Sequence, residues 1–275
     1  MIGLIKDDPF LRFSLFPNSD NLYLLHLHEI IGSFVFYQLV YAYVAPWLNR
    51  LVFRDKYSSI SDAKTRINFD IHTVSSVQCL VTFYTIAPTL FLPMNLNVVT
   101  YRNELVCMAS SMAIGYFLWD LLICIRYFNL YGFEFLAHAA SSLYVFLLSL
   151  KPFCQNWVSK FLLFEASTPF VNNNWFIAQL SRGSSKPVVP LWVNALNGLL
   201  LMTTFFCVRI LWGFIGVSIL IFQMYKVRNA LPIIQSAILC VLNLILNTLN
   251  LFWFYKMLKL AKKMVNGSTR TTKSM

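Results

Sequence analysis

Hydrophobic positions in this chain gather into long runs that are separated by short polar connections. A helix that crosses a membrane needs about 20 consecutive apolar residues. Runs of this kind lie at residues 22–46, 70–92, 106–126, 132–150, 158–180, 189–225 and 232–258. The pattern predicts an all-α, polytopic membrane protein with about seven transmembrane helices. The alternating segments of about ten residues that are typical of a membrane β-barrel do not dominate the sequence.

The run at 189–225 is longer than one straight span of about 30 Å requires. Three ways of fitting it stay open: a tilt, a bend near Gly213 and Gly216, or an extension past the bilayer. Splitting the run into two spans would need a turn inside "RILWGFIGVS", which lacks the Pro and polar residues that tight turns usually have. We therefore expect one long helix.

The composition supports the membrane class. Hydrophobic residues make up 58% of the 275-residue chain and charged residues only 12%, with a mean hydropathy of +0.62. An ordinary soluble domain has about 25% charged residues. The net charge of +11 would suggest a nucleic-acid partner in a soluble protein. Here we expect no such partner, because Lys and Arg gather in loops as signals of membrane orientation.

The basic residues also predict how the chain is oriented. With an odd number of spans, the basic first loop and the basic tail lie on one side, which then carries about twice as many Lys and Arg residues as the other. This predicts a lumenal N-terminus and a cytosolic C-terminus. Residues 1–21 contain Asp7, Asp8 and Asp20 and no continuous apolar core, so we expect no cleavable signal peptide there.

Several ionisable residues lie inside the apolar runs or near their ends. Those within the runs are Glu29, Asp120, Glu134, His138, Glu165 and Arg209, and those near helix ends are His26, His28, Asp70 and His72. A charged side chain at the centre of a bilayer costs about 2.5–3.5 kcal/mol on insertion scales, so we expect these groups to face the protein interior. Arg209 needs a carboxylate partner, which either Asp120 or Glu165 can supply. The pair has two interpretations: an ion pair that fixes helix packing, or part of a polar site that binds a lipid headgroup or carries chemistry.

Two pairs of polar residues suggest further chemistry. Glu134 and His138 are four apart and share a helix face, where a carboxylate can orient an imidazole as a general base. The alternative is a packed histidine that only forms hydrogen bonds. His72 and Gln78 are six apart and lie on different faces of a helix, so they need not serve one site.

The stretch "FLLFEASTPFVNNNWFIAQL", residues 161–180, places polar groups and a proline in an apolar run. Glu165 and Asn172 are seven apart, which is about two helical turns, and they face one cavity if the helix resumes after Pro169. The alternative is a short interfacial helix with one end in water.

Six stretches resemble the TLC-domain family, in particular its fungal members similar to the animal TLC-domain-containing protein 4 group. They are "NFDIHTVSSVQCL", "GYFLWDLL", "FEFLAHAASSLYVF", "FLLFEASTPFVNNNWF", "VNALNGLLLMTTFFCVRILWG" and "LNLILNTLNLFWFYKM". The resemblance implies six helices around a lipid-accepting cavity, preceded by one extra helix. It divides the chain into residues 1–64 with the first helix and a cytosolic loop, a TLC domain at 65–260, and a basic cytosolic tail at 261–275. It also implies residence in the endoplasmic reticulum.

The same family includes ceramide synthases, which transfer a fatty acyl group from coenzyme A to a sphingoid amine. Those enzymes carry adjacent histidines at the position that matches His138 and Ala139, and this chain keeps only the first. We therefore expect a protein of lipid homeostasis that binds a membrane lipid or fatty acyl chain. The alternatives are an acyltransferase that uses acyl-CoA as substrate, and a lipid-sorting or cargo receptor of the early secretory pathway.

The candidate catalytic residues are His138 and Asp120. No cofactor is implied, and the scattered cysteines and histidines lack the spacing of a metal site. The candidate residues for binding the substrate are Glu165, Arg209, Asn172, Trp175, His72, Gln78 and Asn197.

Overall fold

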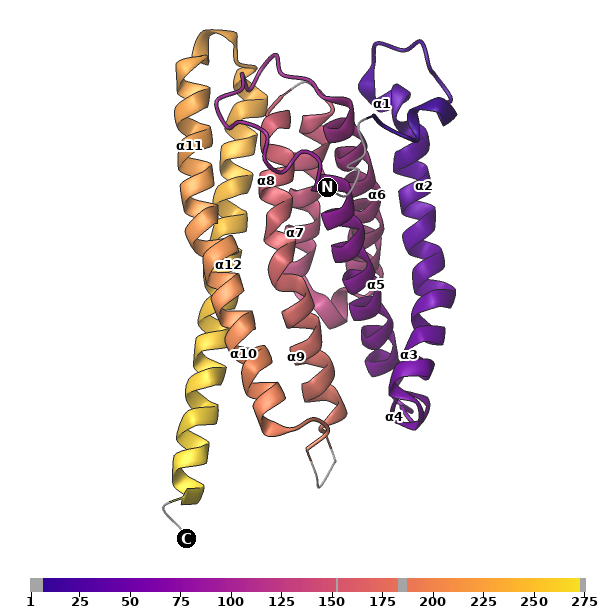
Figure 1. Cartoon of the computed structure of the whole chain (residues 1–275), viewed down its shortest axis with the longest axis vertical. Helices are drawn as coiled ribbons and strands as arrows, with labels where there is room; N and C mark the ends of the chain where they lie inside the picture. Colours follow the sequence, from indigo (N-terminus) through magenta and orange to yellow (C-terminus); the bar gives the residue numbers. More distant parts are fainter. Residues whose placement is uncertain (1–6, 152, 183–186, 273–275) are drawn as a thin grey trace.

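The computed structural model describes residues 7–151, 153–182 and 187–272, and these form a bundle of long helices (Figure 1). The main helices are α1 (Leu22–Leu25), α2 (Leu27–Leu39), α3 (Ala45–Phe53), α4 (Asp55–Ser58), α5 (Ala63–Ile86), α6 (Glu104–Arg126), α7 (Phe128–Ser149), α8 (Val158–Leu162), α9 (Thr168–Leu180), α10 (Leu191–Phe205), α11 (Trp212–Lys226) and α12 (Ile233–Thr272). Short π- and 3₁₀-helical turns join several of them, including η2 (Val40–Val44), η4 (Leu163–Ser167) and η5 (Phe206–Leu211).

Side chains at the helix starts explain where several helices begin. The side chain of Asp62 accepts hydrogen bonds from the backbone N–H groups of Lys64 and Thr65 at the start of α5. Asn103 accepts one from Val106 at the start of α6. These bonds satisfy N–H groups that have no partner within the helix. The hydroxyl of Thr65 also donates to Asp62, which lowers the pKa of this exposed carboxyl group.

Helix α6 packs closely against α2 through a glycine. A Cβ atom at Gly115 would lie 2.5 Å from the carbonyl oxygen of Ile30 and 2.6 Å from the Cβ of Ser33. The Ser33 hydroxyl donates a 2.7 Å hydrogen bond to the backbone oxygen of Met112 across the same contact. The missing side chain at Gly115 therefore sets the distance between the two helices.

The long run at 189–225 forms one continuous helical segment from Leu191 to Lys226, as predicted. Its irregularity is the π-helical turn η5, which contains Arg209 and ends just before Gly213, one of the two glycines considered for a bend. A π-helical turn widens a helix locally and often occurs at functional sites. It directs Arg209 toward the interior, where the residue is buried.

Within the described part of the chain, five helical segments are long and apolar enough to cross a membrane. They are Leu27–Phe53, Glu104–Arg126, Phe128–Ser149, Leu191–Lys226 and Ile233–Lys262. The predicted run at 70–92 corresponds to α5, which starts with charged residues, and the run at 158–180 is divided among α8, η4 and α9. The structure confirms the all-α membrane class, and the count of about seven spans stays a prediction.

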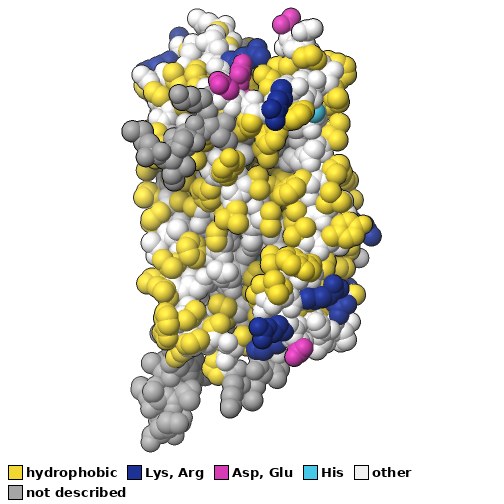
Figure 2. All heavy atoms as spheres, turned by 45° about the vertical axis from the view of Figure 1, so that its right-hand side comes forward, with side chains coloured by type: hydrophobic (Ala, Val, Ile, Leu, Met, Phe, Trp, Pro, Cys, Tyr) yellow, Lys and Arg dark blue, Asp and Glu magenta, His cyan; other side chains and the backbone are white. Residues whose placement is uncertain are grey.

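The surface agrees with a membrane setting. Hydrophobic side chains cover the middle of the face in Figure 2, and Lys and Arg lie mostly toward its two ends. Helix α4, in the first loop, lies at the same end of the bundle as the C-terminus, whereas α1 lies at the other end (Figure 1). The first loop and the tail thus share one end, as the charge pattern requires. The last residues of the predicted tail, 273–275, lie outside the described residues.

Candidate functional site

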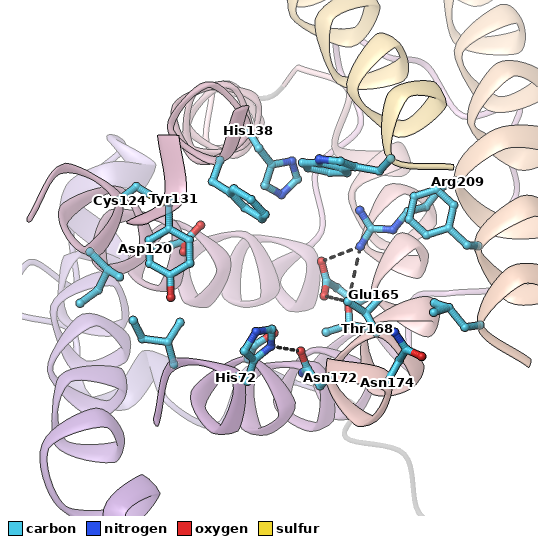
Figure 3. A pocket seen from close by; sticks show the side chains of 18 of the residues that line it. His72, Asp120, Cys124, Tyr131, His138, Glu165, Thr168, Asn172, Asn174 and Arg209 are labelled. Atoms are coloured by element: carbon cyan, nitrogen blue, oxygen red, sulfur yellow. Dashed lines mark hydrogen bonds and ion pairs between the residues drawn. The ribbon is translucent and has the colours of Figure 1, made fainter. Parts of the chain in front are cut away.

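A cavity of about 370 Å³ lies among α5, α6, α7, α9, η5 and α12 (Figure 3). Its wall combines acids, bases and amides with aromatic and aliphatic side chains. Prominent among the lining residues are His72, Tyr116, Phe117, Asp120, Tyr131, Phe135, His138, Glu165, Thr168, Asn172, Leu201, Phe205, Arg209, Trp253 and Lys256. The four ionisable groups predicted to turn inward, Asp120, His138, Glu165 and Arg209, therefore share one cavity.

Arg209 and Glu165 form an ion pair on one side of this cavity. The guanidinium Nη2 of Arg209 lies 3.8 Å from Oε1 of Glu165, and both side chains are mostly buried. Of the two carboxylates that the sequence offered as partners, Glu165 is the one that Arg209 meets. The Arg209 side chain also lies over the ring of Phe205, with 5.4 Å between its central carbon and the ring centroid.

The sequence Glu165–Thr168 explains how the pair is held. Glu165 and Ser167 belong to the 3₁₀ turn η4, and Thr168 is the first residue of α9. Pro169 follows in the first turn of α9, where its missing N–H removes no helical hydrogen bond. Arg209 Nε donates to the Ser167 hydroxyl at 2.9 Å, and the Thr168 hydroxyl donates to Glu165 Oε2 at 2.7 Å. Buried charges are tolerated when their remaining hydrogen-bonding groups are satisfied in this way.

His72 and Asn172 form another part of the wall, and Asn172 lies near Thr168 on α9 (Figure 3). His72 Nδ1 donates to the side-chain oxygen of Asn172 at 2.8 Å, an assignment that follows from the amide oxygen being an acceptor. Asn172 in turn donates to the Ser76 hydroxyl at 2.9 Å. Glu165 and Asn172 both line the cavity, because the helix resumes after Pro169 as predicted.

Three residues that the sequence suggested as binding groups do not line the cavity. Gln78 is buried and donates to the Thr82 hydroxyl at 2.8 Å, one turn along α5. Asn197 donates to the backbone oxygen of Phe170 at 3.1 Å and joins α10 to α9. Trp175 stacks on His72 with ring centroids 4.2 Å apart and supports that imidazole from behind. The amide N–H groups of Gln78 and Asn197 are thus used in contacts within the protein.

His138 lines the cavity, but the predicted carboxylate partner does not reach it. Its ring packs edge-on against Phe117 and Trp253, with centroid distances of 6.4 and 5.4 Å. Glu134 instead accepts hydrogen bonds from Lys256 Nζ at 3.1 Å and from Trp253 Nε1 at 3.3 Å. Sharing a helix face was therefore not sufficient to bring the Glu134 carboxylate to the His138 ring, because Glu134 pairs with the neighbouring helix α12.

Asp120 and His138 form no side-chain hydrogen bond to another protein group in the described ranges 7–151, 153–182 and 187–272. Figure 3 shows Asp120 beside Tyr131 on one side of the cavity and His138 on another, with Arg209 and Glu165 across from Asp120. A carboxylate and an imidazole that face a cavity are free to contact a ligand. Together with the ion pair, they supply hydrogen-bond donors and acceptors on three sides.

Comparison with known proteins identifies the family. Residues 68–259 match the TLC domain (TRAM, LAG1 and CLN8) family. The chain belongs to the TLC domain family. It is 54% identical over 263 residues to the Saccharomyces cerevisiae protein named Topoisomerase I damage affected protein 4, covering 96% of this chain and 93% of that protein.

More distant relatives carry the family name itself. The chain is 32% identical over 249 residues to an uncharacterized TLC domain-containing protein of Schizosaccharomyces pombe, covering 90% of this chain and 82% of the relative. It is 29% identical over 249 residues to human TLC domain-containing protein 4, covering 85% and 88% of the two chains. No solved structure matches the chain.

The sequence reasoning missed a stripe of asparagines on the last helix of this TLC domain. Asn243, Asn247 and Asn250 are all buried. They line a smaller hollow of about 60 Å³, which shares the side chains of His138 and Arg209 with the main cavity. The signal was present as a spacing of four and three residues, which places all three on one helix face.

Proposed function

We propose that this TLC domain protein binds a membrane lipid in the cavity and acts in lipid homeostasis. The observation that carries the proposal is the shared cavity itself. Asp120, His138, Glu165 and Arg209 face it together with aromatic rings, inside a bundle of membrane-spanning helices. Ionisable groups within membrane segments are costly and therefore point to function when they face one internal space.

The wall suggests which part of a lipid enters. Arg209 offers N–H donors to an acidic or carbonyl oxygen, and the carboxylates of Asp120 and Glu165 accept from hydroxyl or amine groups. The rings of Phe117, Phe135 and Trp253 offer apolar contact. Ligand cavities span about 300–1,000 Å³, and this one lies near the lower end of that range. We infer that a headgroup or one acyl chain enters, while the rest of the lipid stays in the bilayer.

Mass spectrometry of lipids that copurify with the protein tests this proposal. Val171 on α9 lines the cavity, so Val171→Phe fills part of the space. Leu199 on α10 is exposed on the outer surface, so Leu199→Phe adds similar bulk outside the cavity. We expect wild type and Leu199→Phe to retain one lipid class that Val171→Phe loses. Equal lipid content in all three proteins would contradict binding in this cavity.

Acyl transfer from acyl-CoA is a second candidate, supported by His138 and Asp120, which line the cavity and form no side-chain hydrogen bond to another described residue. A general base must reach the proton that it removes, and an imidazole that faces the substrate space meets this condition. Among the residues that the structure describes, no carboxylate is bonded to His138, and this favours binding over catalysis, because no acid orients the base.

Lipid profiling of a strain that lacks the gene separates the two candidates. If the protein is an acyltransferase, one acylated lipid class falls, and His138→Ala and Asp120→Ala fail to restore it although both proteins are expressed. A lipid carrier or a sorting receptor tolerates His138→Ala better than Val171→Phe. Tagging either terminus for protease protection tests the further proposal that the protein resides in the endoplasmic reticulum with its C-terminus in the cytosol.

A further inference from the structure

A second group of buried ionisable residues lies apart from the cavity. Asp8 belongs to the N-terminal segment, and His26 and Glu29 belong to the start of α2, at the end of the bundle where α1 lies (Figure 1). Their exposed fractions are 8%, 1% and 6%. None of the three lines the lipid cavity. We call them the N-terminal acid–histidine cluster.

The cluster is short of hydrogen-bond donors. His26 Nδ1 lies 3.0 Å from Oε2 of Glu29 and 3.6 Å from Oδ2 of Asp8. In the described chain, the buried oxygens Asp8 Oδ2 and Glu29 Oε1 have no hydrogen-bond partner. His28 does not fill this need, because its Nε2 bonds to the backbone oxygen of Phe10 and lies 3.7 Å from Glu29. Two buried carboxylates beside one imidazole are neutralised either by added protons or by a bound cation.

The geometry of the cluster matches a metal site. One ligand atom from each residue lies within 4.8 Å of the other two. Tetrahedral zinc with bonds of about 2.0–2.1 Å places neighbouring ligand atoms about 3.4 Å apart. The two measured separations from His26 Nδ1, 3.0 and 3.6 Å, lie on either side of this value. A neutral imidazole and two carboxylates carry two negative charges, which a divalent cation balances.

We propose that Asp8, His26 and Glu29 bind a divalent cation, with Zn²⁺ as the preferred ion. Imidazole nitrogen and carboxylate oxygen are ligands that Zn²⁺ accepts, and three protein ligands leave one position for water. The ion would join the N-terminal segment to the first membrane helix. This differs from the sequence expectation, which found no metal spacing because Asp8 is 18 residues from His26 in the chain.

A neighbouring backbone group fits a supporting role. The other oxygen of Asp8 accepts a 2.8 Å hydrogen bond from the backbone N–H of Phe10, which holds this carboxylate in place.

Metal analysis of the full-length protein in detergent tests the proposal. The protein is stripped with a chelator, reloaded with Zn²⁺, passed through a desalting column and measured by plasma mass spectrometry. We expect about one Zn²⁺ per chain in wild type, and an affinity lowered at least about tenfold in Asp8→Asn and Glu29→Gln. Asp7→Asn is the matched control, because Asp7 is exposed and lies next to Asp8.

Two measurements distinguish a loss of zinc binding from a loss of folding. X-ray absorption of the loaded wild type should show nitrogen and oxygen neighbours at about 2.0–2.1 Å, including the imidazole signature. The melting temperature of wild type and Asp7→Asn should rise with added Zn²⁺ and not with Mg²⁺, while Asp8→Asn melts as a single transition without this response. Zinc content below about one tenth per chain in reloaded wild type, or equal zinc affinity in wild type and Asp8→Asn, would overturn the proposal.

Discussion

Two regions of the molecule bury their side chains in opposite ways. One is the contact between α2 and α6, and the other is the cavity beside α9 and η5. At Gly115 two helices approach so closely that a single added carbon atom would overlap the backbone of Ile30. Around Arg209 the helices stand apart, and polar side chains bond to one another across the gap. Buried residues make up 61% of the most apolar stretch of α6 but only 22% of that of α12. The first region is therefore closely packed, whereas the second leaves a cavity with polar groups in its wall.

The largest effect is expected from breaking the ion pair on the cavity side. Arg209→Met removes the cation from Glu165 and leaves a mostly buried carboxylate, which costs about 3–5 kcal/mol when the charge stays. We expect poor yield and a clearly lowered melting temperature in detergent. Adding Glu165→Gln to Arg209→Met should restore part of the stability, because no unpaired charge then remains.

Arg126→Met is the matched control for this experiment, since Arg126 is exposed at the end of α6. It should leave the melting temperature nearly unchanged. If Arg209→Met and Arg126→Met behave alike, the ion pair does not stabilise the cavity wall, and the contrast between the two regions would not hold there.

A smaller loss is expected at the packed contact. Gly115→Ala places a methyl group 2.5 Å from a backbone oxygen, so α2 must shift, at a cost of about 1–3 kcal/mol. Gly32→Ala on α2 is the control, because no atom lies within 4 Å of a Cβ built there. Thermal unfolding should separate the two variants, with lipid content unchanged in both. Loss of bound lipid in Gly115→Ala would show that the packed region and the cavity are coupled.

The sequence was sufficient to predict the helical class and the inward-facing acids and bases, because hydrophobic length and the cost of buried charge are local properties. One cavity is lined by all four of the groups predicted to face inward, which are Asp120, His138, Glu165 and Arg209. The long helix at 191–226 was also predictable, because the stretch around Gly213 lacks the Pro and polar residues that usually form tight turns.

The hydrogen-bond partner of each polar side chain could not be predicted from the sequence, because it depends on which helices become neighbours. Glu134 shares a face with His138, yet it pairs with Lys256 from a distant part of the chain. Gln78 is polar in an apolar run, yet it does not line the cavity, and its amide N–H donates to the Thr82 hydroxyl one turn away. The structure was also needed to bring Asp8 to His26, since the segment between them folds back onto the start of α2.

A third prediction concerns the hydrogen bonds in the part of the cavity wall that His72 and Asn172 form. Asn172→Ala removes the acceptor of His72 and the donor to Ser76, and leaving such buried groups unpaired costs about 1–3 kcal/mol. We expect a lower melting temperature and weaker lipid retention together. The neighbouring Asn173 is exposed, so Asn173→Ala should change neither quantity. Equal behaviour of the two variants would remove His72 from the proposed site.

The smallest effect is expected at the edge of the cavity, where Glu134 meets Lys256. Their side chains are 36% and 53% exposed, so water screens the pair and its contribution to stability is about 0–1 kcal/mol. Glu134→Gln should therefore melt close to wild type. If Glu134 oriented His138 as the sequence suggested, Glu134→Gln would reproduce the lipid phenotype of His138→Ala. We expect it not to, because the Glu134 carboxylate is bonded to α12 and not to the imidazole. Comparing these two variants with Lys259→Gln, an exposed cation on the same helix, in one lipid-retention assay decides whether His138 acts with a carboxylate or alone.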